Sequence, residues 1–547
     1  MTPWQNKPLC IMLCISIFLL LCSPLHADQI DEQMARMTLP QRIGQIMMIG
    51  IQGQSIDAKD AARIKKIDPG GLVLYGRNFR EAQDIARLIT QIRSVPTGSR
   101  LPMFFAMDQE GGIVHRIRDE FYMPPSAPAI ASTGSERFAY DVALAVGSAL
   151  RELGININLA PVLDVPSDLL SSPMTFRSFS NDPEEVAGFG TSYIRGLKEA
   201  GLLATAKHFP NLGRTLSDSH LGLPRMKWGS SEERDRDILP FKRAIGEGVD
   251  LIMTGHVIAE PGDGNNPVSL SSYWLNDVLR GELGFEGLVV GDDLEMKAVA
   301  VSTPVPAAAV RSFNAGADII MVSHESKKQE EVFRSLMDAV KKGIITEARL
   351  NSSLKRIIET KNKILPKNKP GGAKEALKDL SAAAAEMYVT ALQATDSPSY
   401  SAGAEEKILF AGYNLALLDE VRKNFSRTSV MNYPIKNLGL LNPGSSTEEF
   451  IKRFDAVIID ASYGDAAWVI SVCERLGIRY FLVQSQLQTA LRTIERLRPK
   501  QMILAHEINR MNYRVALEII RGARKAAGRL PINLPLPAKY IYKPKDM

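Results

Sequence analysis

The chain has few cysteines, and their positions exclude a disulfide framework. Four cysteines occur in 547 residues, and Cys10, Cys14 and Cys22 all lie in the N-terminal segment. We expect that segment to be removed, which leaves Cys473 alone, so neither an internal disulfide nor a cysteine-based metal site can form. The mature chain must therefore be held together by its hydrophobic cores, and its length favours more than one of them.

The chain also lacks a strong excess of charge of either sign. Its formal net charge is +5, from 66 lysines and arginines against 61 aspartates and glutamates, and no Lys/Arg-rich run stands beside aromatic residues. This balance is too weak to attract nucleic acid, so we expect no nucleic-acid partner. The sequence contains no phosphate-cradling loop and no ligand spacing typical of a metal site. We therefore expect neither a cofactor nor a metal.

Charge is scarce at the N-terminus, where an apolar run stands instead. Lys7 is the only charged residue before Asp28, and residues 9–22 are almost wholly apolar. The run is shorter than the roughly 18 residues of a membrane-spanning helix and is typical of a secretory signal peptide, with Ala27 at the cleavage position. These features predict a signal peptide at 1–27 and an exported protein, periplasmic or extracellular, with no stable membrane insertion after signal removal.

Two alternatives for this segment stay open. The segment could be retained as an uncleaved membrane anchor. It could also carry a lipid on Cys22, although the bulky Leu21 stands where lipid-modified sites resemble small residues.

Eight apolar runs follow one another at the spacing of a TIM barrel, up to about residue 325. Most are too continuously apolar for an open antiparallel sheet and are typical of strands buried on both faces. Helical patterns such as "REAQDIARLITQIRSV" lie between them. Strand and helix repeated eight times predict a (β/α)8 barrel. The eight runs are "IGQIMMIGIQG", "GGLVLYG", "PMFFAMDQEGG", "NINLAPVLDV", "LLATAKHFP", "DLIMTGHV", "GLVVGDDLE" and "ADIIMVSHE".

Polar and charged residues stand where these runs end. In a barrel the carboxyl ends of the strands share one face, where the active site forms, so we expect these side chains to lie close together. Any one of them alone is more often structural, but such groups at seven strand ends are hard to explain as packing. They are Arg77, Asp108, Asp164, Lys207, His208, His256, Asp292, Asp293 and His324.

The composition changes after the predicted barrel, which we place at 28–365. "PKNKPGGAKE" is typical of a linker, predicted at 366–384, and "ALKDLSAAAAEMYVTALQ" is predicted to be helical. Four further apolar runs, separated by helical stretches, predict a smaller α/β sandwich domain with a mostly parallel sheet at 385–547. Its strand ends carry fewer acids and bases, so we expect it to support the barrel or to shape the substrate site. The four runs are "KILFAGY", "AVIIDAS", "RYFLVQS" and "QMILAHE".

One loop combines a carboxylate and an imidazole. The stretch "KHFPNLGRTLSDSHLGLP", Lys207 to Pro224, follows an apolar strand and places Asp218 two residues before His220. "MDQEGG", "APVLDV", "RSFSNDP" and "GDDLEM" occur around it in order. With these motifs the chain resembles glycoside hydrolase family 3, in the two-domain form of its bacterial β-N-acetylglucosaminidase branch. The resemblance covers both predicted domains and implies a TIM barrel followed by an α/β sandwich.

Two positions depart from the family pattern. Members usually have Gly-His-Gly after "KHFP", where this chain has Asn211, Leu212 and Gly213. They usually have Arg after "EGG", where this chain has Ile113, with Arg116 kept three residues later. The first departure affects the loop with the "DSH" motif and the second affects the pocket wall. Neither removes a group that we assign to the chemistry.

The resemblance implies a retaining glycosidase whose nucleophile is Asp292. Retaining enzymes form a covalent glycosyl-enzyme on one carboxylate and use a second group as acid and base. Consecutive strand residues point to opposite sides, so only one of Asp292 and Asp293 can face the site, and this rule does not choose between them. The resemblance selects Asp292 and leaves Asp293 in a supporting or structural role.

The acid/base group is expected on the "DSH" loop. Residues two apart do not share a helix face, so a contact between Asp218 and His220 needs an irregular loop, for which "NLGRTLSDSH" is suitable. A carboxylate there can fix the imidazole tautomer and stabilise its cation. The resemblance thus implies His220 as acid/base, oriented by Asp218. The alternative is a solvated loop with an incidental Asp and His.

The resemblance also implies a sugar pocket and an oligosaccharide partner. For Lys207 the alternative is an ion pair at the edge of the core, with Asp164 or another strand-end acid, which does not exclude substrate contact. Met253 and His256 are expected in the pocket wall. The expected partner is a small-molecule GlcNAc-containing oligosaccharide, such as a muropeptide. The residues implied for the non-reducing-end pocket are Asp108, Arg116, Arg177, Lys207 and His208.

Other activities are alternatives to an exo-β-N-acetylglucosaminidase acting on cell-wall fragments. A family 3 β-glucosidase or other β-hexosidase typically lacks the "DSH" loop. A phosphorolytic variant would use phosphate in place of water. A Schiff-base lyase would use Lys207, because barrel strands often present such lysines. A non-catalytic cell-wall-binding protein is disfavoured, because Asp292 and His220 are both present.

Overall fold

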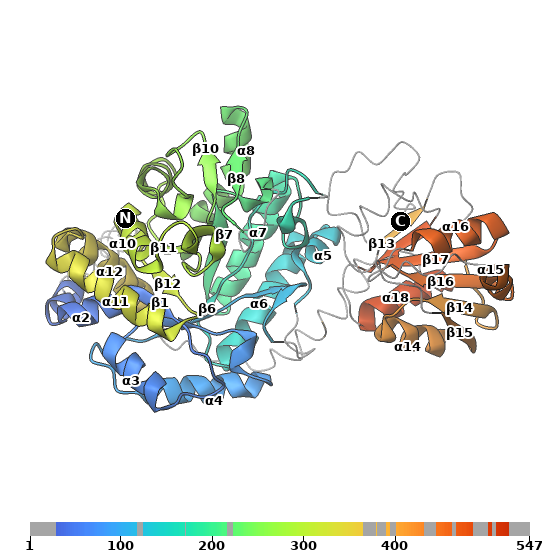
Figure 1. The fold of residues 1–547 in the computed structure, drawn as a ribbon, viewed down its shortest axis with the longest axis horizontal. Coiled ribbons are helices and arrows are strands. Elements are labelled where there is room, and N and C mark those ends of the chain that lie inside the picture. Colours follow the sequence, from blue (N-terminus) through green and yellow to red (C-terminus); the bar gives the residue numbers. More distant parts are fainter. Residues whose placement is uncertain are drawn as a thin grey trace, which may run out of the picture.

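The chain forms two bodies, each with its own sheet, in the computed structural model (Figure 1). The predicted signal peptide lies outside the described residues, as does the predicted linker except for residue 379. The bounds of the domains therefore stay predictions. None of the helices formed by the described residues has the length and apolar character needed to cross a bilayer. The structure describes residues 29–117, 124–169, 171–215, 222–364, 379, 390–393, 401–431, 445–461, 466–484, 501–505 and 510–523.

The first body is a closed barrel of eight parallel strands. Each strand pairs with the next, and β12 pairs with β1. A bridge between Val290 and Ile319 closes the seam between β11 and β12, where the Asp318 N–H also donates to the Val289 carbonyl (2.8 Å). The predicted (β/α)8 barrel is confirmed, and each strand lies within one of the eight apolar runs. The strands are β1 (Met47–Ile49), β2 (Gly71–Val73), β3 (Phe104–Met107), β6 (Ile157–Asn158), β7 (Leu203–Phe209), β9 (Leu251–Thr254), β11 (Leu288–Gly291) and β12 (Ile320–Val322).

Every residue of these strands is buried. Helices cover the outside of the barrel and side chains fill its interior, which explains the continuously apolar runs. Lys207 and His208, both in β7, are the only titratable side chains in the eight strands. Because burying a charge is costly unless it is paired, these two residues must have partners.

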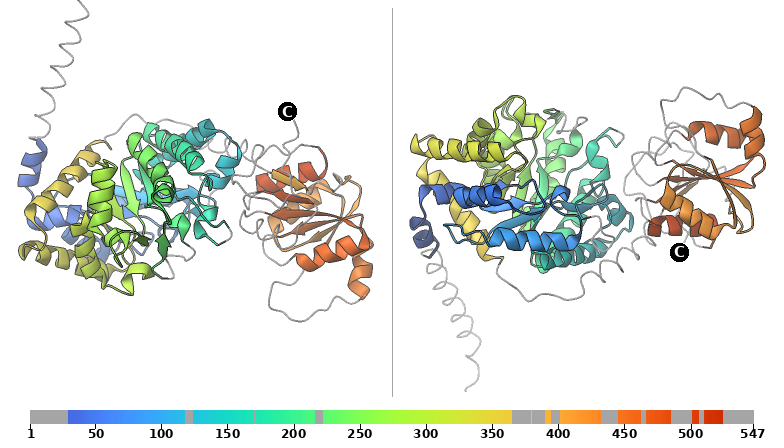
Figure 2. Two further views of the ribbon diagram at one scale, coloured as in Figure 1. Left: turned by 90° about the horizontal axis from the view of Figure 1, so that it is seen from above. Right: turned by 60° about the horizontal axis from the view of Figure 1, so that its bottom comes forward.

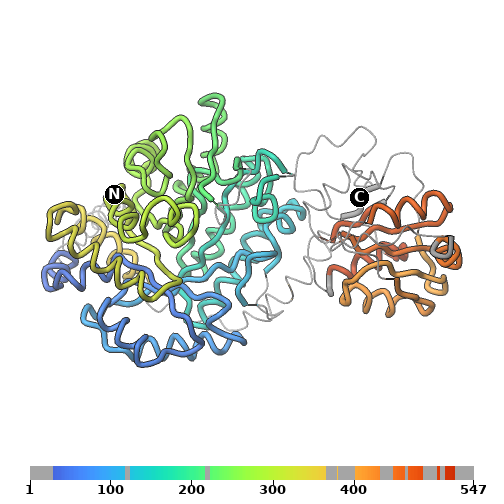
Figure 3. The backbone as a smooth tube through the Cα atoms, in the orientation of Figure 1, coloured from blue at the N-terminus to red at the C-terminus, as the bar shows by residue number. Residues whose placement is uncertain are grey.

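Helices alternate with the strands and surround the barrel (Figure 3). Their starts follow from the sequence: Ser135 caps α6 by accepting a hydrogen bond from the Phe138 N–H. The helix before the first barrel strand contacts the helix after the last one: Lys361 Nζ donates to Gln45 Oε1 (2.6 Å). The helices are α2 (Leu39–Gln45), α3 (Ala58–Ile67), α4 (Ala82–Arg93), α5 (Ala127–Ser132), α6 (Glu136–Glu152), α7 (Pro183–Glu199), α8 (Ser231–Gly246), the π-helix η5 (Tyr273–Glu282), α9 (Lys297–Ala300), α10 (Val305–Ala315), α11 (Ser326–Lys341) and α12 (Glu347–Asn362).

Short elements extend the carboxyl ends of the barrel strands. The antiparallel pair β4 (Gln109–Gly111) and β5 (Val114–His115) follows β3, and the parallel pair β8 (Arg225–Lys227) and β10 (Ile258–Glu260) follows β7 and β9. Both pairs therefore stand on the face where the charged strand ends meet. Single 3-10 turns complete these connections: η1 (Gly76–Asn78), η2 (Pro173–Phe176), η3 (Leu212–Arg214) and η4 (Val268–Leu270).

The second body is a six-stranded sheet in the order β13-β18-β17-β16-β14-β15, parallel except for β13. Helices cover both of its faces (Figure 2), with α16 packed in one core and α14 and α18 in the other. The predicted α/β sandwich is thus confirmed. The elements are β13 (Thr390–Gln393), β14 (Lys407–Ala411), β15 (Arg427–Met431), β16 (Ala456–Asp460), β17 (Arg479–Gln484), β18 (Gln501–Leu504), α14 (Leu415–Asn424), α15 (Ser445–Ile451), α16 (Ala467–Leu476) and α18 (Arg510–Ile520).

Two strands of this sheet differ from the sequence prediction. Residues 390–393, "TALQ", were predicted to be helical but form β13, because they pair antiparallel with β18, which would otherwise be an edge strand. β15 was not predicted because it has no buried residue: it is itself an edge strand, and its residues are exposed or half-exposed. An apolar run cannot reveal a strand of that kind.

Candidate active site

Lys207 lies at the centre of a cluster of charged side chains on the carboxyl face of the barrel. It is 1% exposed, and its Nζ atom lies 2.8 Å from Asp108 Oδ1 and 2.5 Å from Glu110 Oε1. Asp108 directly follows β3, and Glu110 lies two residues further, in β4. The two carboxylates compensate the buried ammonium, which is what a charge in this position requires.

Two arginines complete this ion network. Arg177, which follows η2, donates to Glu110 through Nε (2.8 Å) and Nη2 (2.7 Å), a bidentate pair. Arg116, which follows β5, donates to Asp108 Oδ2 through Nη2 (2.8 Å). The cluster therefore combines three cations and two anions and keeps an excess of positive charge.

The cations keep both carboxyl groups ionised. Burial acts to raise the pKa of Asp108, but Lys207 and Arg116 outweigh it and hold the pKa well below its usual range. Burial also acts to raise the pKa of Glu110, and Arg177 and Lys207 outweigh it, lowering the pKa to about 2. The cluster thus has fixed charges over the whole physiological pH range.

His208 forms a separate pair with Asp164, which follows β6. Its Nδ1 lies 2.7 Å from Asp164 Oδ2, and its Nε2 lies 3.4 Å from Arg177 Nη2. Because a guanidinium only donates, Nε2 acts as the acceptor, and Nδ1–H donates to Asp164. Asp164 thereby fixes the tautomer and the orientation of the imidazole.

A shift in the register of β7 accompanies the two neighbouring site residues. Lys207 pairs with Met253 of β9, and Phe209 pairs with the next β9 residue, Thr254, so His208 is the extra residue of a bulge. Bulges next to active sites re-aim side chains that regular alternation would direct to opposite faces. Lys207 and His208 can therefore both contact residues of the ion network, through Glu110 and Arg177.

The loop after β7 is tied to the loop after β6. Asn211 accepts from the Val165 N–H (2.9 Å) and donates to the Val165 carbonyl (3.1 Å), and the Leu212 N–H donates to Asp164 Oδ1 (2.6 Å). Leu212 is buried. The two residues that depart from the family pattern thus hold the start of the loop in place. Asp218, further along the loop, lies outside the described residues.

Asp292 and Asp293 follow β11 and have different surroundings. Asp292 is partly exposed, and its Oδ1 accepts from the Asp293 N–H (2.8 Å). Asp293 is buried: its carboxyl group accepts from the Ser323 N–H (3.1 Å) and the Glu295 N–H (2.8 Å) and shares a hydrogen bond with the Ser323 hydroxyl. Burial is the main reason that the pKa of Asp293 is raised to about 7. Only Asp292 is open to the face of the barrel.

Tyr75 and His256 connect Asp292 with the ion network. Burial raises the pKa of Tyr75, and so does the negative charge of Asp293, Asp108 and Asp292 in turn. Burial lowers the pKa of His256. The negative charge of Asp292 acts to raise this pKa, and a positive charge on His208 would lower it further. Because β3, β7 and β11 all end on this face, Asp292 lies on the same face of the barrel as Asp108 and His208.

His256 itself is held as a neutral imidazole. Its Nε2–H donates to the Asp293 carbonyl (3.0 Å), which can only accept, and its Nδ1 accepts from the Ser269 hydroxyl (2.7 Å). It is completely buried beneath the site.

The family follows from a comparison with known proteins. A family model described as "Glycosyl hydrolase family 3 N terminal domain" matches residues 38–360, which is more than half of the chain. The chain belongs to glycosyl hydrolase family 3. The match begins directly before α2 and ends inside α12, so the family 3 domain is the barrel with its helices.

Relatives in family 3 carry related names. A "Beta-hexosaminidase" of Stenotrophomonas maltophilia is 32% identical over 340 residues, which is 58% of this chain and 98% of the relative. One of Alkalilimnicola ehrlichii is 33% identical over 53% of this chain and 84% of the relative. A solved "glycoside hydrolase family 3 beta-N-acetylglucosaminidase" of Paenibacillus is 28% identical, with a TM-score of 0.79 over 91% of this chain and 99% of that one.

The predicted pocket residues are brought together in this family 3 barrel. Asp108, Arg116 and Lys207 form one connected network with Arg177 and Glu110, and His208 contacts that network through Arg177. The alternative for Lys207, an ion pair with Asp164 or another strand-end acid, is met by another strand-end acid: Lys207 pairs with Asp108, while Asp164 pairs with His208. His220, like Asp218, lies outside the described residues, so the acid/base assignment stays a prediction.

Three residues of the site were not singled out from the sequence. Glu110 stands two residues after Asp108 within the quoted "MDQEGG" motif, a spacing that places both on one side of an extended chain. Tyr75 and Ser323 stand at strand ends but are uncharged, so a pattern of acids and bases does not reveal them. The described residues contain no group of three His, Cys, Asp or Glu side chains that could hold a metal ion.

Proposed function

We propose that the protein is a retaining, exo-acting β-N-acetylglucosaminidase that removes terminal β-linked GlcNAc from peptidoglycan-derived or related oligosaccharides. At the coarser level it is a glycoside hydrolase of the β-N-acetylhexosaminidase type, which the relatives and the family 3 barrel support. The finer substrate and the mechanism are the proposal. One observation carries the proposal: the partly exposed Asp292 lies on the same face of the barrel as the buried ion network around Lys207.

The network suits recognition of a sugar ring. Lys207 and Asp108 are ionised neighbours at 2.8 Å, and together they offer N–H donors and carboxylate acceptors to hydroxyl groups, which both donate and accept. Their geometry is set before substrate arrives, because Arg116 and Glu110 hold them in place. Preorganised polar groups of this kind fix orientation and cost little ordering on binding.

The reaction would use two steps. Asp292 attacks the anomeric carbon, and the leaving oxygen takes a proton from His220, which yields a glycosyl ester and the shortened oligosaccharide. His220 then removes a proton from water, which attacks the anomeric carbon and frees Asp292. Asp218 orients the imidazole throughout. These roles of His220 and Asp218 rest on the "DSH" motif.

The localisation belongs to the same proposal. Export guided by residues 1–27 would bring the enzyme to the cell wall, where such oligosaccharides occur. Sequencing of the mature N-terminus should then begin near Asp28, and recovery of intact Met1 from the cytosol would contradict export.

One assay panel tests the function. The purified protein is given matched nitrophenyl β-N-acetylglucosaminide and β-glucoside, then purified muropeptides, each with and without phosphate. We expect preference for the N-acetylglucosaminide, release of GlcNAc from muropeptides, and no dependence on phosphate. A faster β-glucoside reaction would identify a β-glucosidase, a sugar phosphate product would identify a phosphorylase, and no turnover with retained binding would identify a wall-binding protein.

A further inference from the structure

We infer that Asp293 works in its protonated form as a positioning residue for Asp292, holding one proton at the buried end of a chain of hydroxyl groups. The inference rests on the proposed function, because it takes Asp292 as the nucleophile. It concerns the ends of β11, β12 and β2, none of which carries the ion network around Lys207.

The chain of hydroxyl groups runs from Asp293 through Ser323 to Tyr75. Asp293 is 3% exposed, and its Oδ2 atom contacts both the hydroxyl and the N–H of Ser323. The Ser323 Oγ atom in turn lies 2.7 Å from the Tyr75 hydroxyl. The other carboxyl oxygen of Asp293 accepts from the Glu295 N–H (2.8 Å). Three strand ends are therefore joined by one continuous set of hydrogen bonds.

No cation in the described part of the chain pairs with Asp293 as Lys207 pairs with Asp108. The nearest basic group is His324, whose Nε2 lies 3.7 Å from Asp293 Oδ2. Its Nδ1 lies 3.2 Å from Arg77 Nη1 and so must accept, which leaves the imidazole neutral. Burial and the cationic neighbours Arg77, Arg116 and Lys328 lower the pKa of His324, which also favours the neutral form.

The groups around Asp293 favour its neutral form. Asp292 and Glu295 are carboxyl groups close to it, and their negative charge adds to the main effect, burial, in raising the pKa of Asp293 to about 7. A buried carboxylate without a cation is costly, so the proton stays on Asp293 while the exposed Asp292 carries the charge. The titratable groups that face Asp293 or act on it are Asp292 and Glu295 beyond β11, His324 beyond β12, Tyr75 and Arg77 beyond β2, and Lys328 of α11.

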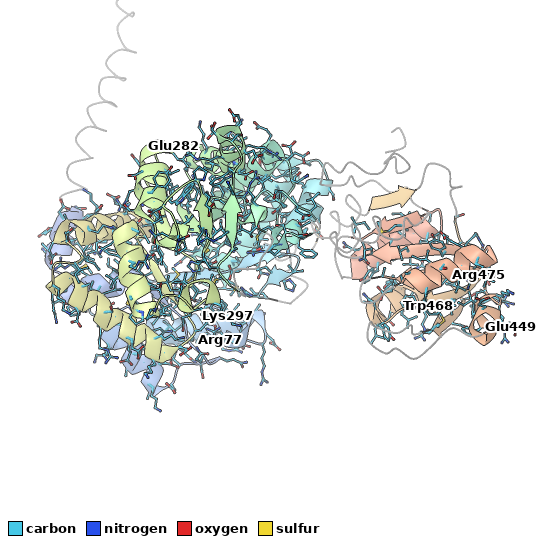
Figure 4. The ribbon with its side chains drawn as sticks, turned by 45° about the horizontal axis from the view of Figure 1, so that its top comes forward. Arg77, Glu282, Lys297, Glu449, Trp468 and Arg475 are labelled. Atoms are coloured by element: carbon cyan, nitrogen blue, oxygen red, sulfur yellow. The ribbon has the colours of Figure 1, made fainter. Side chains whose placement is uncertain are left out.

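The protonation state sets the direction of the hydroxyl chain. When Asp293 is protonated, it can donate to Ser323, and Ser323 can donate to Tyr75, so the phenol proton is available to an acceptor in the site. When Asp293 is ionised, Ser323 must donate to it, and Tyr75 donates to Ser323 instead. The ring of Tyr75 is held for either role by Arg77, whose guanidinium lies 4.5 Å from the ring centre and which is labelled in Figure 4.

Asp293 also fixes Asp292 through its backbone. The Asp293 N–H donates to Asp292 Oδ1 (2.8 Å), and the Asp293 carbonyl accepts from His256 Nε2 (3.0 Å). Ionisation of Asp293 would have two effects at once. It would place a second negative charge next to the nucleophile, and it would reverse the donor direction of the hydrogen bonds from Asp293 through Ser323 to Tyr75. Both changes would disturb the attack on the anomeric carbon.

The pH dependence of kcat/KM on the N-acetylglucosaminide tests the inference. In the wild type it should fall as pH rises through about 7, because Asp293 loses its proton. Asp293→Asn stays neutral at every pH and can still donate to the Ser323 hydroxyl, although it loses the hydrogen bond from the Ser323 N–H; it should keep measurable activity at pH 6 while losing this alkaline limb. Asp293→Ala is the matched control: it has no donor and should lose activity at every pH. If kcat/KM of Asp293→Asn falls with rising pH as it does in the wild type, the fall belongs to another group, such as His220, and the inference is overturned.

A second variant and a second readout keep the test decisive. The Ser323 hydroxyl lowers the pKa of Asp293, so Ser323→Ala should move the alkaline limb to higher pH. An unmoved limb overturns the inference even if Asp293→Asn fails to fold. Infrared difference spectroscopy of the unliganded wild type should give a protonated-carboxyl band that titrates near pH 7 and is absent in Asp293→Asn. This band needs no turnover, so its absence overturns the inference independently of whether the proposed substrate is right.

Discussion

The barrel and the second sheet both consist mainly of buried parallel strands, yet they use the residues at their strand ends differently. In the barrel, side chains at the ends of β3 and β7 converge on one another, as Asp108 and Lys207 do. In the second sheet, Asp460 at the end of β16 accepts from the backbone N–H groups of Tyr413 (3.3 Å) and Asn414 (3.0 Å) and so fixes the start of α14. The same residue type serves a site in one body and a helix start in the other.

Closure explains this difference. A barrel brings all its strand ends around one axis, so side chains far apart in sequence meet at its mouth. An open sheet sets its strand ends in a row, and each carboxylate finds its partners in the connection beside it. The surface of the second body is accordingly occupied by local pairs such as Arg475 of α16 with Glu448 (Figure 4 labels Arg475). Five substitutions, in four tests, probe this difference between the barrel and the second body.

The largest effect is expected for Asp292→Asn. Without a carboxylate, no glycosyl ester can form, so kcat should fall by at least about 10⁴-fold. A slow 5-fluoro substrate should leave a sugar on the wild-type peptide that contains Asp292 and on no peptide of the variant. Tight inhibition by a thiazoline mimic, with no labelled peptide, would show that the substrate's own acetamido group attacks instead.

His220→Ala should have the next largest effect, and its size should depend on the leaving group. General acid help is worth about 10²–10⁴-fold, so sugar leaving groups should lose this much in kcat/KM while activated phenols lose little. Azide should restore turnover of the phenyl substrates, because it attacks without a base. Asp218→Asn should give the same pattern more mildly. Equal losses for all leaving groups, without azide rescue, would leave His220 with a loop-positioning role only.

Glu110 should make the stability of the barrel sensitive to acid. Its pKa is lowered from 4.5 to about 2 in the folded protein. A lowered pKa contributes stability that is present above about pH 4.5 and lost as pH falls towards 2, here about 3 kcal/mol. Calorimetry between pH 6 and pH 3 should show the barrel transition moving down in the wild type. Glu110→Gln should start lower and move less; an equal shift in both would contradict the assignment.

The smallest effect on activity is expected for Asp460→Ala in the second sheet. It leaves the Tyr413 and Asn414 N–H groups without their carboxylate, which should cost that body about 1–3 kcal/mol. Because the hydrogen bonds from Tyr413 and Asn414 to Asp460 lie within the second body, kcat/KM should stay within about twofold of the wild type. A loss of activity comparable to that of the barrel variants would mean that the second body contributes to the site.

The fold was largely predictable because its main signal is local. Eight largely apolar runs contain all eight barrel strands, since burial on both faces strongly favours apolar residues. β15 gave no such signal, because an edge strand has an exposed face, and β13 depends on its pairing with β18 rather than on its own residues. Both misses come from contacts that are absent from the sequence pattern.

The sequence predicted which residues gather in the site but not which of them form ion pairs with one another. The strand-end rule and the family motifs named Asp108, Lys207 and His208, which do lie together. They did not reveal that Asp164 pairs with His208 while Glu110 pairs with Lys207, because these pairs depend on the bulge in β7. Pairing of charges follows from three-dimensional register, which residue types alone do not contain.

The pairing of β12 with β1 makes the barrel a ring with no intrinsic first element. Lys361 of α12 donates to Gln45 of α2, so α2, which precedes the first barrel strand, contacts α12, which follows the last one. The chain order that begins with α2 is therefore one of several cuts through the same ring. A circular permutant of the barrel alone that begins with α12, joins α12 to α2 through a short linker and ends with α11 near Gly343 would keep every strand pair of the barrel and the ion network around Lys207.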